Sequence, residues 1–157
     1  MPFRTGRGKS RVPPEGLDGA QHASLATMDV VGTVFVALAA LLHVYIWWME
    51  SVAWRRPAVW RRFGLASQAD ADTTAPLAYN QGFYNLFLAA GAVVGVALYW
   101  TTSEPAGFAL AVFSAGSMVA AAAVLLSTGR ERLRAAATQG TLPLLGVLFF
   151  LLSLPLS

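Results

Sequence analysis

The chain of 157 residues contains no cysteine and little charge. Without cysteine it cannot form disulfides, thiolate metal sites or a cysteine nucleophile. Aspartate, glutamate, lysine and arginine together make up only 12% of the residues, whereas 56% of the residues are hydrophobic. Few soluble domains have this composition. The sequence therefore indicates a membrane protein whose chemistry does not depend on thiol groups.

Several motifs of common activities are also absent. The sequence has no glycine-rich phosphate-binding loop, no zinc-type pair of histidines on one helix and no serine motif of the nucleophile-elbow kind. We therefore expect no metal site. The four basic residues near the N-terminus have no aromatic residues interleaved with them, which is a weak signal for nucleic acid. We expect no nucleic-acid partner.

Four apolar stretches each have about 20 residues, the length that crosses a bilayer as a helix. They occupy residues 30–51, 77–100, 106–127 and 138–156. This pattern predicts an all-α fold: an integral membrane four-helix bundle over residues 29–157, preceded by a disordered basic arm over residues 1–28. The arm is rich in arginine, glycine and proline and has no apolar core. It does not resemble a cleaved signal, because mostly polar residues separate its basic residues from Val30.

The arginines predict how the bundle is oriented. Outside the arm they all lie in the stretches after the first and third spans, which share one side of a four-span protein. The positive-inside rule places this side in the cytoplasm. We therefore expect a multi-pass cell-membrane protein with residues 52–76 and 128–137 in the cytoplasm and both termini outside. The basic arm favours the opposite orientation, but its charges lie at the edge of the window in which the rule applies.

The segment Trp54–Leu65 alternates arginines with aromatic and apolar residues at helical spacing. It predicts a short helix in the membrane interface, either as an ordinary anchor or as a site for an anionic lipid. The polar stretch 67–76 then predicts a loop, with Pro76 at the start of the second span.

Two ionisable residues, His43 and Glu50, lie seven residues apart within the first apolar stretch. This spacing is close to two helical turns, so both project from nearly the same face, together with Trp47. A charge inside a bilayer is costly, and such residues usually face a bundle interior or a cavity. They are the first candidates for a functional site.

The second span begins with a dense polar run, Asn80, Gln81, Tyr84 and Asn85, on one helical arc that Gly91 and Gly95 continue. Small residues four apart let helix backbones approach closely. We therefore expect this stripe to face another helix along its whole length, with its polar end buried in protein. Because Gln139 begins the fourth span at a similar depth, the pattern predicts a polar pocket in the cytoplasmic half of the bundle.

These residues carry a resemblance to a family. The stretches 42–50, 62–65, 79–91 and 139–143 resemble a small bacterial integral membrane family known as DUF1304, a domain of unknown function, and the likeness covers about residues 30–155. Leu86 stands where the family usually has glycine, residues 120–126 replace an expected tyrosine-glycine pattern, and the basic arm is extra. The resemblance implies a four-helix membrane protein and no particular activity. It marks as signature residues His43, Glu50, Asn80, Gln81, Tyr84, Asn85 and Gln139.

Three functions fit this pattern. The first is a cofactor-free membrane enzyme of isomerase or lyase type that acts on a lipophilic small molecule by acid–base chemistry, through isomerisation, cyclisation or epoxide opening. Its catalytic residues would be His43, Glu50 and Tyr84, and its substrate would contact Asn80, Gln81, Asn85, Trp47 and Gln139. Haem bound by His43 is an alternative without an evident second ligand.

The second function is a proton-coupled carrier that works as a homo-oligomer, because four spans are few for a transporter. The third is an assembly module in which the polar residues only join helices. Taken singly, the amides and Tyr84 have such a structural explanation, and Glu50 could be an ion-paired interfacial carboxylate. His43 is the hardest to explain in this way.

Overall fold

The computed structural model describes residues 15–154, with side chains from residue 19 onward, and helices joined by short turns make up these residues. No strand occurs among these residues, which confirms the predicted all-helical class. In chain order, the elements are α1 Glu15–Trp47, the π-helical η1 Trp48–Val52, α2 Pro57–Trp60, the 3-10 helix η2 Arg61–Phe63, α3 Gln68–Thr101, α4 Glu104–Ser127, the 3-10 helix η3 Arg130–Arg132 and α5 Leu133–Leu152.

Four helical stretches are long and apolar enough to cross a membrane. They are Gly19–Val52, Gln68–Thr101, Glu104–Ser127 and Arg130–Leu152. The first two have 34 residues each, or roughly 50 Å at 1.5 Å per residue, against a hydrocarbon core of about 30 Å. The lengths and composition indicate a multi-pass membrane protein whose first two spans extend well beyond the hydrocarbon.

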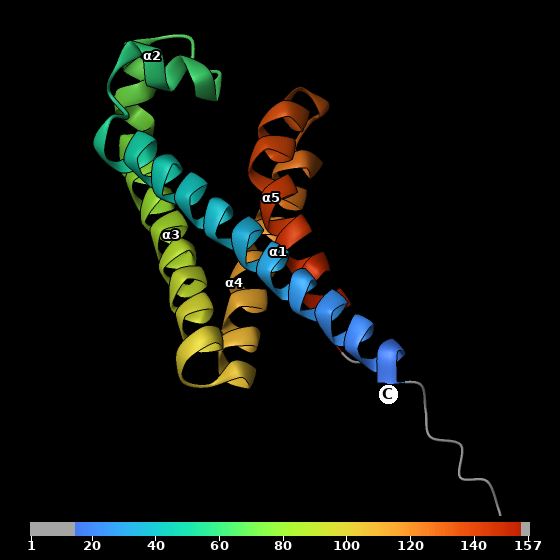
Figure 1. The fold of residues 1–157 in the computed structure, drawn as a ribbon. Coiled ribbons are helices and arrows are strands. Elements are labelled where there is room, and N and C mark those ends of the chain that lie inside the picture. The colour runs from blue at the N-terminus through green and yellow to red at the C-terminus, as the bar shows by residue number, and fades with distance from the viewer. Residues whose placement is uncertain (1–14, 155–157) are drawn as a thin grey trace, which may run out of the picture.

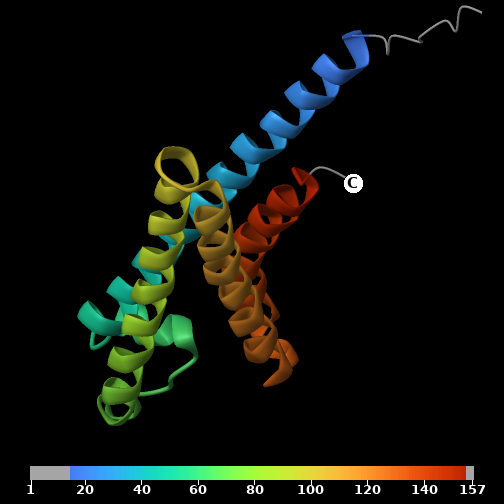
Figure 2. The same ribbon diagram turned by 90° about the horizontal axis from the view of Figure 1, so that it is seen from below.

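The long helices pack in the cyclic order α1, α3, α4, α5, with little contact between α1 and α4. Figures 1 and 2 show that α3 and α4 lie together near their short connection and separate toward their other ends. The molecule therefore has two arms at one end, one made by α2 and the first half of α3, the other by the α4–α5 connection. Helix α1 crosses from the first arm to the far end of α5.

Small residues bring the helices together at the joined end. A Cβ on Gly95 would lie 2.8 Å from Ala111 Cα, and one on Gly91 would lie 3.6 Å from Ser114 Cβ. Gly146 of α5 likewise lets Val36 of α1 pack close to the α5 backbone. The prediction that Gly91 and Gly95 let another helix approach is therefore confirmed, and that helix is α4.

The first helix begins earlier than predicted. Of the arm expected over residues 1–28, residues 1–14 lie outside the described part, whereas residues 15–28 form the first turns of α1. The first helix therefore extends into the predicted arm and begins at Glu15. Adding a turn to an existing helix needs no new nucleus, and alanines and leucines in this stretch favour helix despite its glycines.

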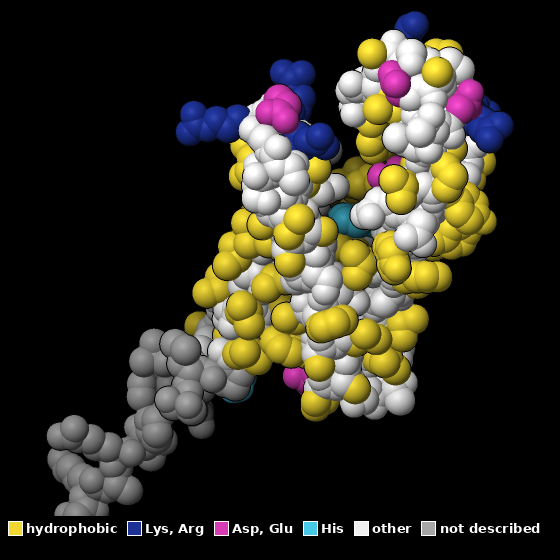
Figure 3. Space-filling view, turned by 180° about the vertical axis from the view of Figure 1, so that it is seen from behind, with side chains coloured by type: hydrophobic (Ala, Val, Ile, Leu, Met, Phe, Trp, Pro, Cys, Tyr) yellow, Lys and Arg dark blue, Asp and Glu magenta, His cyan; other side chains and the backbone are white. Residues whose placement is uncertain are grey.

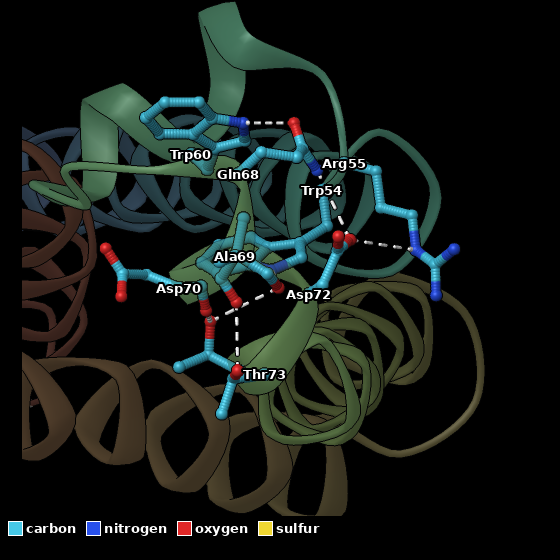
Figure 4. Close-up of polar contacts among 10 residues, drawn as sticks. Trp54, Arg55, Trp60, Gln68, Ala69, Asp70, Asp72 and Thr73 are labelled. Atoms are coloured by element: carbon cyan, nitrogen blue, oxygen red, sulfur yellow. Dashed lines mark hydrogen bonds and ion pairs between the residues drawn. The ribbon is translucent and has the colours of Figure 1, made fainter.

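The predicted loop over residues 67–76 is also wrong, because α3 begins at Gln68. Ser67 caps the helix by accepting a hydrogen bond from the backbone N–H of Asp70 at 3.1 Å. Figure 4 shows the contacts that secure this first turn: Trp54 Nε1 donates to Ala71 O at 2.9 Å, and Trp60 Nε1 donates to Gln68 Oε1 at 3.1 Å. Pro76 thus lies inside the helix and leaves the carbonyl one turn earlier without its usual donor.

The predicted short helix after the first span is present as α2 and η2. Pro57 occupies its first turn, Val59 and Trp60 are buried, and Gly64 ends it with a φ of 83°. Figure 3 shows that the arginines gather at the tips of the two arms, over the α2 segment and over the α4–α5 connection. The two basic connections therefore share one end of the molecule, as the sequence predicts, and this is called the arginine end below.

Candidate functional site

The arginine end is hollowed between the two arms. Figure 3 shows this hollow, with a histidine and an acidic side chain visible on its floor. Of the residues predicted to form a site, three are buried in the described structure: His43, Glu50 and Asn85. These three lie on α1, η1 and α3, so the site depends on the packing of the first arm.

His43 is buried in the bundle, with 1% of its surface exposed. Its Nδ1 lies 2.9 Å from the carbonyl oxygen of Ala39, one turn earlier on α1. Because a carbonyl only accepts, Nδ1 carries the proton in this contact, and Nε2 of the neutral ring is an acceptor. No described residue forms a hydrogen bond with Nε2. The ring therefore presents a lone pair that no described residue shares.

Glu50 lies in the π-helical turn η1, where Ala53 N bonds to Trp48 O at 2.9 Å. Its side chain is 8% exposed. Asn85 Nδ2 donates to Glu50 Oε2 at 2.9 Å and also to the backbone oxygen of Gln81 at 3.1 Å. Single π-helical turns occur often at functional sites, and here the turn follows the end of α1 and bears the carboxylate.

Gly82 lets helix α3 pack closely against this turn. A Cβ on Gly82 would collide with Ser51 Oγ and lie 3.1 Å from Glu50 Cβ. Ser51 Oγ donates to the backbone oxygen of Tyr79 at 3.0 Å. Gly82 and Asn85, which belong to the polar run of α3, therefore hold Glu50 in place from the neighbouring helix. Sequence analysis did not identify Ser51 or Gly82 as site residues, although the glycine within a polar run was a usable signal.

Trp47 lies beside α3, with its ring edge to face against Phe83 at 6.2 Å between centroids. Its indole nitrogen Nε1 is enclosed and has no hydrogen-bond partner, and it is the one such side-chain atom in the described residues. Buried N–H groups are nearly always satisfied. This nitrogen therefore lacks an acceptor that a bound molecule or a water would supply.

The other predicted residues are less buried than expected. Asn80, Gln81 and Tyr84 are exposed, with Tyr84 at 56%, so the prediction that this polar end is buried in protein was wrong for them. The reason is the separation of α3 from α4. By helical periodicity these side chains share the face of Gly91 and Gly95, which contacts α4 farther along, so they face the hollow. Gln139 is half-buried, one turn before the buried Pro143 on α5.

His43 and Glu50 do not pair with each other. They have different hydrogen-bond partners, Ala39 and Asn85, and lie about 10 Å apart along the helix axis by helical rise. An exchange of protons between them would need a bound molecule or water between them.

A second opening reaches Glu50 from the arginine end. This vestibule is a pocket of about 390 Å³ between η1 and the start of α3, and its lining includes Glu50, Arg55, Asp72 and Pro76. Arg55 Nε lies 3.8 Å from Asp72 Oδ1, with both side chains more than half exposed. Glu50 therefore has a route to water that does not pass through the hollow. Nothing in the sequence singled out Asp72.

A further polar cluster, also missed by sequence analysis, lies at the joined end. Tyr99 donates to Asp29 Oδ1 at 2.6 Å, and Trp100 Nε1 donates to Thr33 Oγ1 at 2.9 Å. These bonds join the middle of α1 to the end of α3. Asp29, at the start of the first apolar stretch, was the available signal.

No group of three or more His, Asp or Glu side chains that could hold a metal ion occurs among the described residues. For a haem, His43 Nε2 is the available ligand atom, and a second protein ligand is not evident on the facing helices.

The comparisons with known proteins agree with the sequence resemblance. A family model described as a protein of unknown function (DUF1304) matches residues 37–151. Neither a curated protein nor a solved structure matches the chain. The matched region includes the π-helical turn, the polar run of α3 and Gln139, and it covers well over half of the chain. The chain belongs to the DUF1304 family.

Proposed function

We propose that this protein is a membrane enzyme that moves a proton within a lipophilic small molecule held in the hollow. It would reside in the cell membrane with the arginine end in the cytoplasm. The observation that carries the proposal is the imidazole of His43, which is 1% exposed, has Nδ1 bonded to Ala39 and has no partner for Nε2 among the described residues.

A polar atom of a buried side chain that makes no hydrogen bond lowers the stability of a fold, by up to about 1–3 kcal/mol where the atom is fully enclosed. A histidine with a purely structural role would be expected to have both ring nitrogens satisfied, or to be replaced by an apolar residue. The arrangement at His43 suits a general base instead. The Ala39 carbonyl fixes the tautomer, which leaves Nε2 able to accept a proton.

In the proposed reaction, Nε2 removes a proton from a carbon next to a substrate carbonyl. After this proton has exchanged with solvent through water and Glu50, Nε2 adds a proton to another carbon of the same molecule. The net change is an isomerisation, which needs no soluble cosubstrate. Negative charge that develops on the carbonyl oxygen would be stabilised by donors that face the hollow. These donors are the amides of Asn80 and Gln81 and the hydroxyl of Tyr84, and the half-buried amide of Gln139 on α5 would be a fourth.

Trp47 and Glu50 have supporting roles in this proposal. The enclosed Nε1 of Trp47 has no acceptor, and a substrate oxygen would provide one. Glu50, held by Asn85 and open to the vestibule, would exchange protons between the site and water. Asn85 itself is occupied by Glu50 and Gln81, so its expected role shifts from binding substrate to positioning Glu50.

A proton-coupled carrier is the second candidate, because Glu50 combines burial with an opening toward one end of the molecule. Such a carboxylate is typical of a coupling site. In that function Glu50, and not His43, would be indispensable, and a homo-oligomer would be needed to complete the pathway.

Solvent deuterium distinguishes the two functions. Proteoliposomes that contain total bacterial lipid extract would be incubated in D₂O with the wild type or with His43→Gln. An enzyme that returns protons to carbon adds deuterium to one extractable component, and the variant would not. The absence of any mass increase with the wild type would contradict the enzyme. Proton flux that is lost in Glu50→Gln and kept in His43→Gln would instead support the carrier.

A further inference from the structure

Two stacked aromatic rings lie on the outer surface of the first span, away from the hollow. Tyr45 and Trp48 have ring centroids 5.9 Å apart and an angle of 20° between their planes. They are exposed at 43% and 36%, and Leu41, Val44 and Val52 on the same helical stretch are exposed too. In a membrane protein this surface faces lipid, and the ring pair lies near its arginine end.

Two arginines from the following connection flank the ring pair. Arg56 Cζ lies 5.7 Å from the centre of the Trp48 ring, and Arg62 Nη1 donates to the Tyr45 hydroxyl at 3.0 Å. The connection packs against the end of η1 and the start of α3, because Val59 and Trp60 are buried at 7% and 4%. Packing therefore fixes the backbone that bears both arginines, and the contacts with Trp48 and Tyr45 orient their exposed side chains.

Neither arginine has an acidic partner. The ion pairs among the described residues are Arg55 with Asp72 and Arg132 with Glu131. Arg56 and Arg62 therefore keep their charge unmatched and most of their N–H donors free. A guanidinium group binds phosphate through two parallel hydrogen bonds, and its contact with an aromatic ring leaves those donors available at its edge.

We propose that Tyr45, Trp48, Arg56 and Arg62 form a binding site for the phosphodiester headgroup of an anionic phospholipid. The two guanidinium groups bind the phosphate, and the ring pair contacts the glycerol and the first methylenes of the acyl chains. A lipid fits better than an acidic protein, because the exposed apolar surface below the rings continues along the span. Aromatic and basic residues at this depth are typical of a membrane interface. This site is independent of the proposed enzyme.

The test is native mass spectrometry of the full chain in mild detergent with equal amounts of phosphatidylglycerol and phosphatidylcholine. The wild type should retain phosphatidylglycerol preferentially, and Arg56→Gln/Arg62→Gln should lower this preference by about tenfold or more. The control Arg132→Gln/Arg134→Gln removes the same charge from the other arm and should leave the preference within about twofold of the wild type.

Two further measurements keep the test decisive. Tyr45→Phe removes only the hydroxyl that positions Arg62, so it should weaken the preference even where the double variant folds poorly. Glycerol 3-phosphate has the charge without the acyl chains and should not displace the lipid at equal concentration. An equal loss in both double variants, no preference in the wild type, or displacement by glycerol 3-phosphate would overturn the proposal.

Discussion

Asn85 of α3 donates a hydrogen bond to Glu50 of η1 across 35 positions of sequence, at 2.9 Å between Nδ2 and Oε2. The bond joins the polar run of the second span to the π-helical turn that ends the first. It is formed between two largely buried side chains, which limits the competition of water for this bond. The geometry of the acidic part of the site therefore depends on the amide of Asn85.

Asn85→Leu is expected to lower the free energy of unfolding by about 1–3 kcal/mol, because the variant leaves a buried carboxyl group without its donor. Thermal unfolding in detergent, followed by circular dichroism, measures the effect. Asn80→Leu makes the same chemical change at an exposed position of the same helix and should stay within about 0.5 kcal/mol of the wild type. Equal losses in the two variants would show that the Glu50 contact has no special role.

Gly82→Ala should destabilise the protein by about 1–3 kcal/mol, because the added methyl group collides with Ser51 and approaches Glu50. The matched control is Gly116→Ala in α4, where a Cβ would meet nothing within 4 Å. That substitution should be neutral or stabilising, since alanine has the higher helix propensity. The prediction fails if the two alanines change the unfolding temperature in the same direction by the same amount.

His43→Leu is expected to retain or raise the unfolding temperature while it abolishes turnover. The leucine fills a similar space in the apolar core and removes a ring nitrogen that has no partner in the described structure. Parallel measurement of thermal unfolding and deuterium incorporation separates the two effects. A loss of more than about 2 kcal/mol of stability would instead identify His43 as a structural residue.

The vestibule predicts that water reaches the neighbourhood of Glu50. Since the chain has no cysteine, single cysteines can be introduced without removing others. Ala75→Cys, which lines the vestibule, should react rapidly with a membrane-impermeant thiol reagent added to the arginine side. Ala115→Cys, at a fully buried position of α4, should react slowly. Similar slow rates at both positions would mean that the vestibule is closed to solvent.

Tyr99→Phe should destabilise the protein by about 0.5–1.5 kcal/mol, because it removes the 2.6 Å hydrogen bond to Asp29 that joins α1 to α3. The site at the arginine end should be unaffected, since the two clusters lie at opposite ends of the bundle. Urea or thermal unfolding measures the loss, and lipid preference and turnover provide the controls. A Tyr99→Phe protein as stable as the wild type would show that this hydrogen bond adds nothing to the net stability of the fold.

The existence of the four long apolar helices and the shared end of the two basic connections were predictable from the sequence. Both depend on local composition: span length, and arginines that cluster in two places. The helix ends were less predictable. Helix α3 begins at the cap that Ser67 provides, nine residues before Pro76, which had suggested a later start. Residues 15–28 extend a helix that the following span already nucleates.

The details of the site depended on distant parts of the chain. The π-helical turn at Glu50 is fitted to Gly82 and Asn85, more than 30 residues later, so no local pattern could reveal it. The exposure of Tyr84 results from the separation of α3 and α4 at the arginine end, which the glycines farther along the same face did not indicate. Residue types predicted which side chains to consider, and tertiary packing decided which of them became buried.

The central claim is that His43 Nε2 faces a binding site for a small molecule. Native mass spectrometry of the wild type beside an equally stable His43→Leu variant, both purified in mild detergent from the same host, tests it most directly. The account predicts a small-molecule adduct on the wild type that the variant lacks and whose mass identifies the class of substrate. Adducts of equal mass and abundance on both proteins, or a bare wild type even after incubation with total lipid extract, would contradict it.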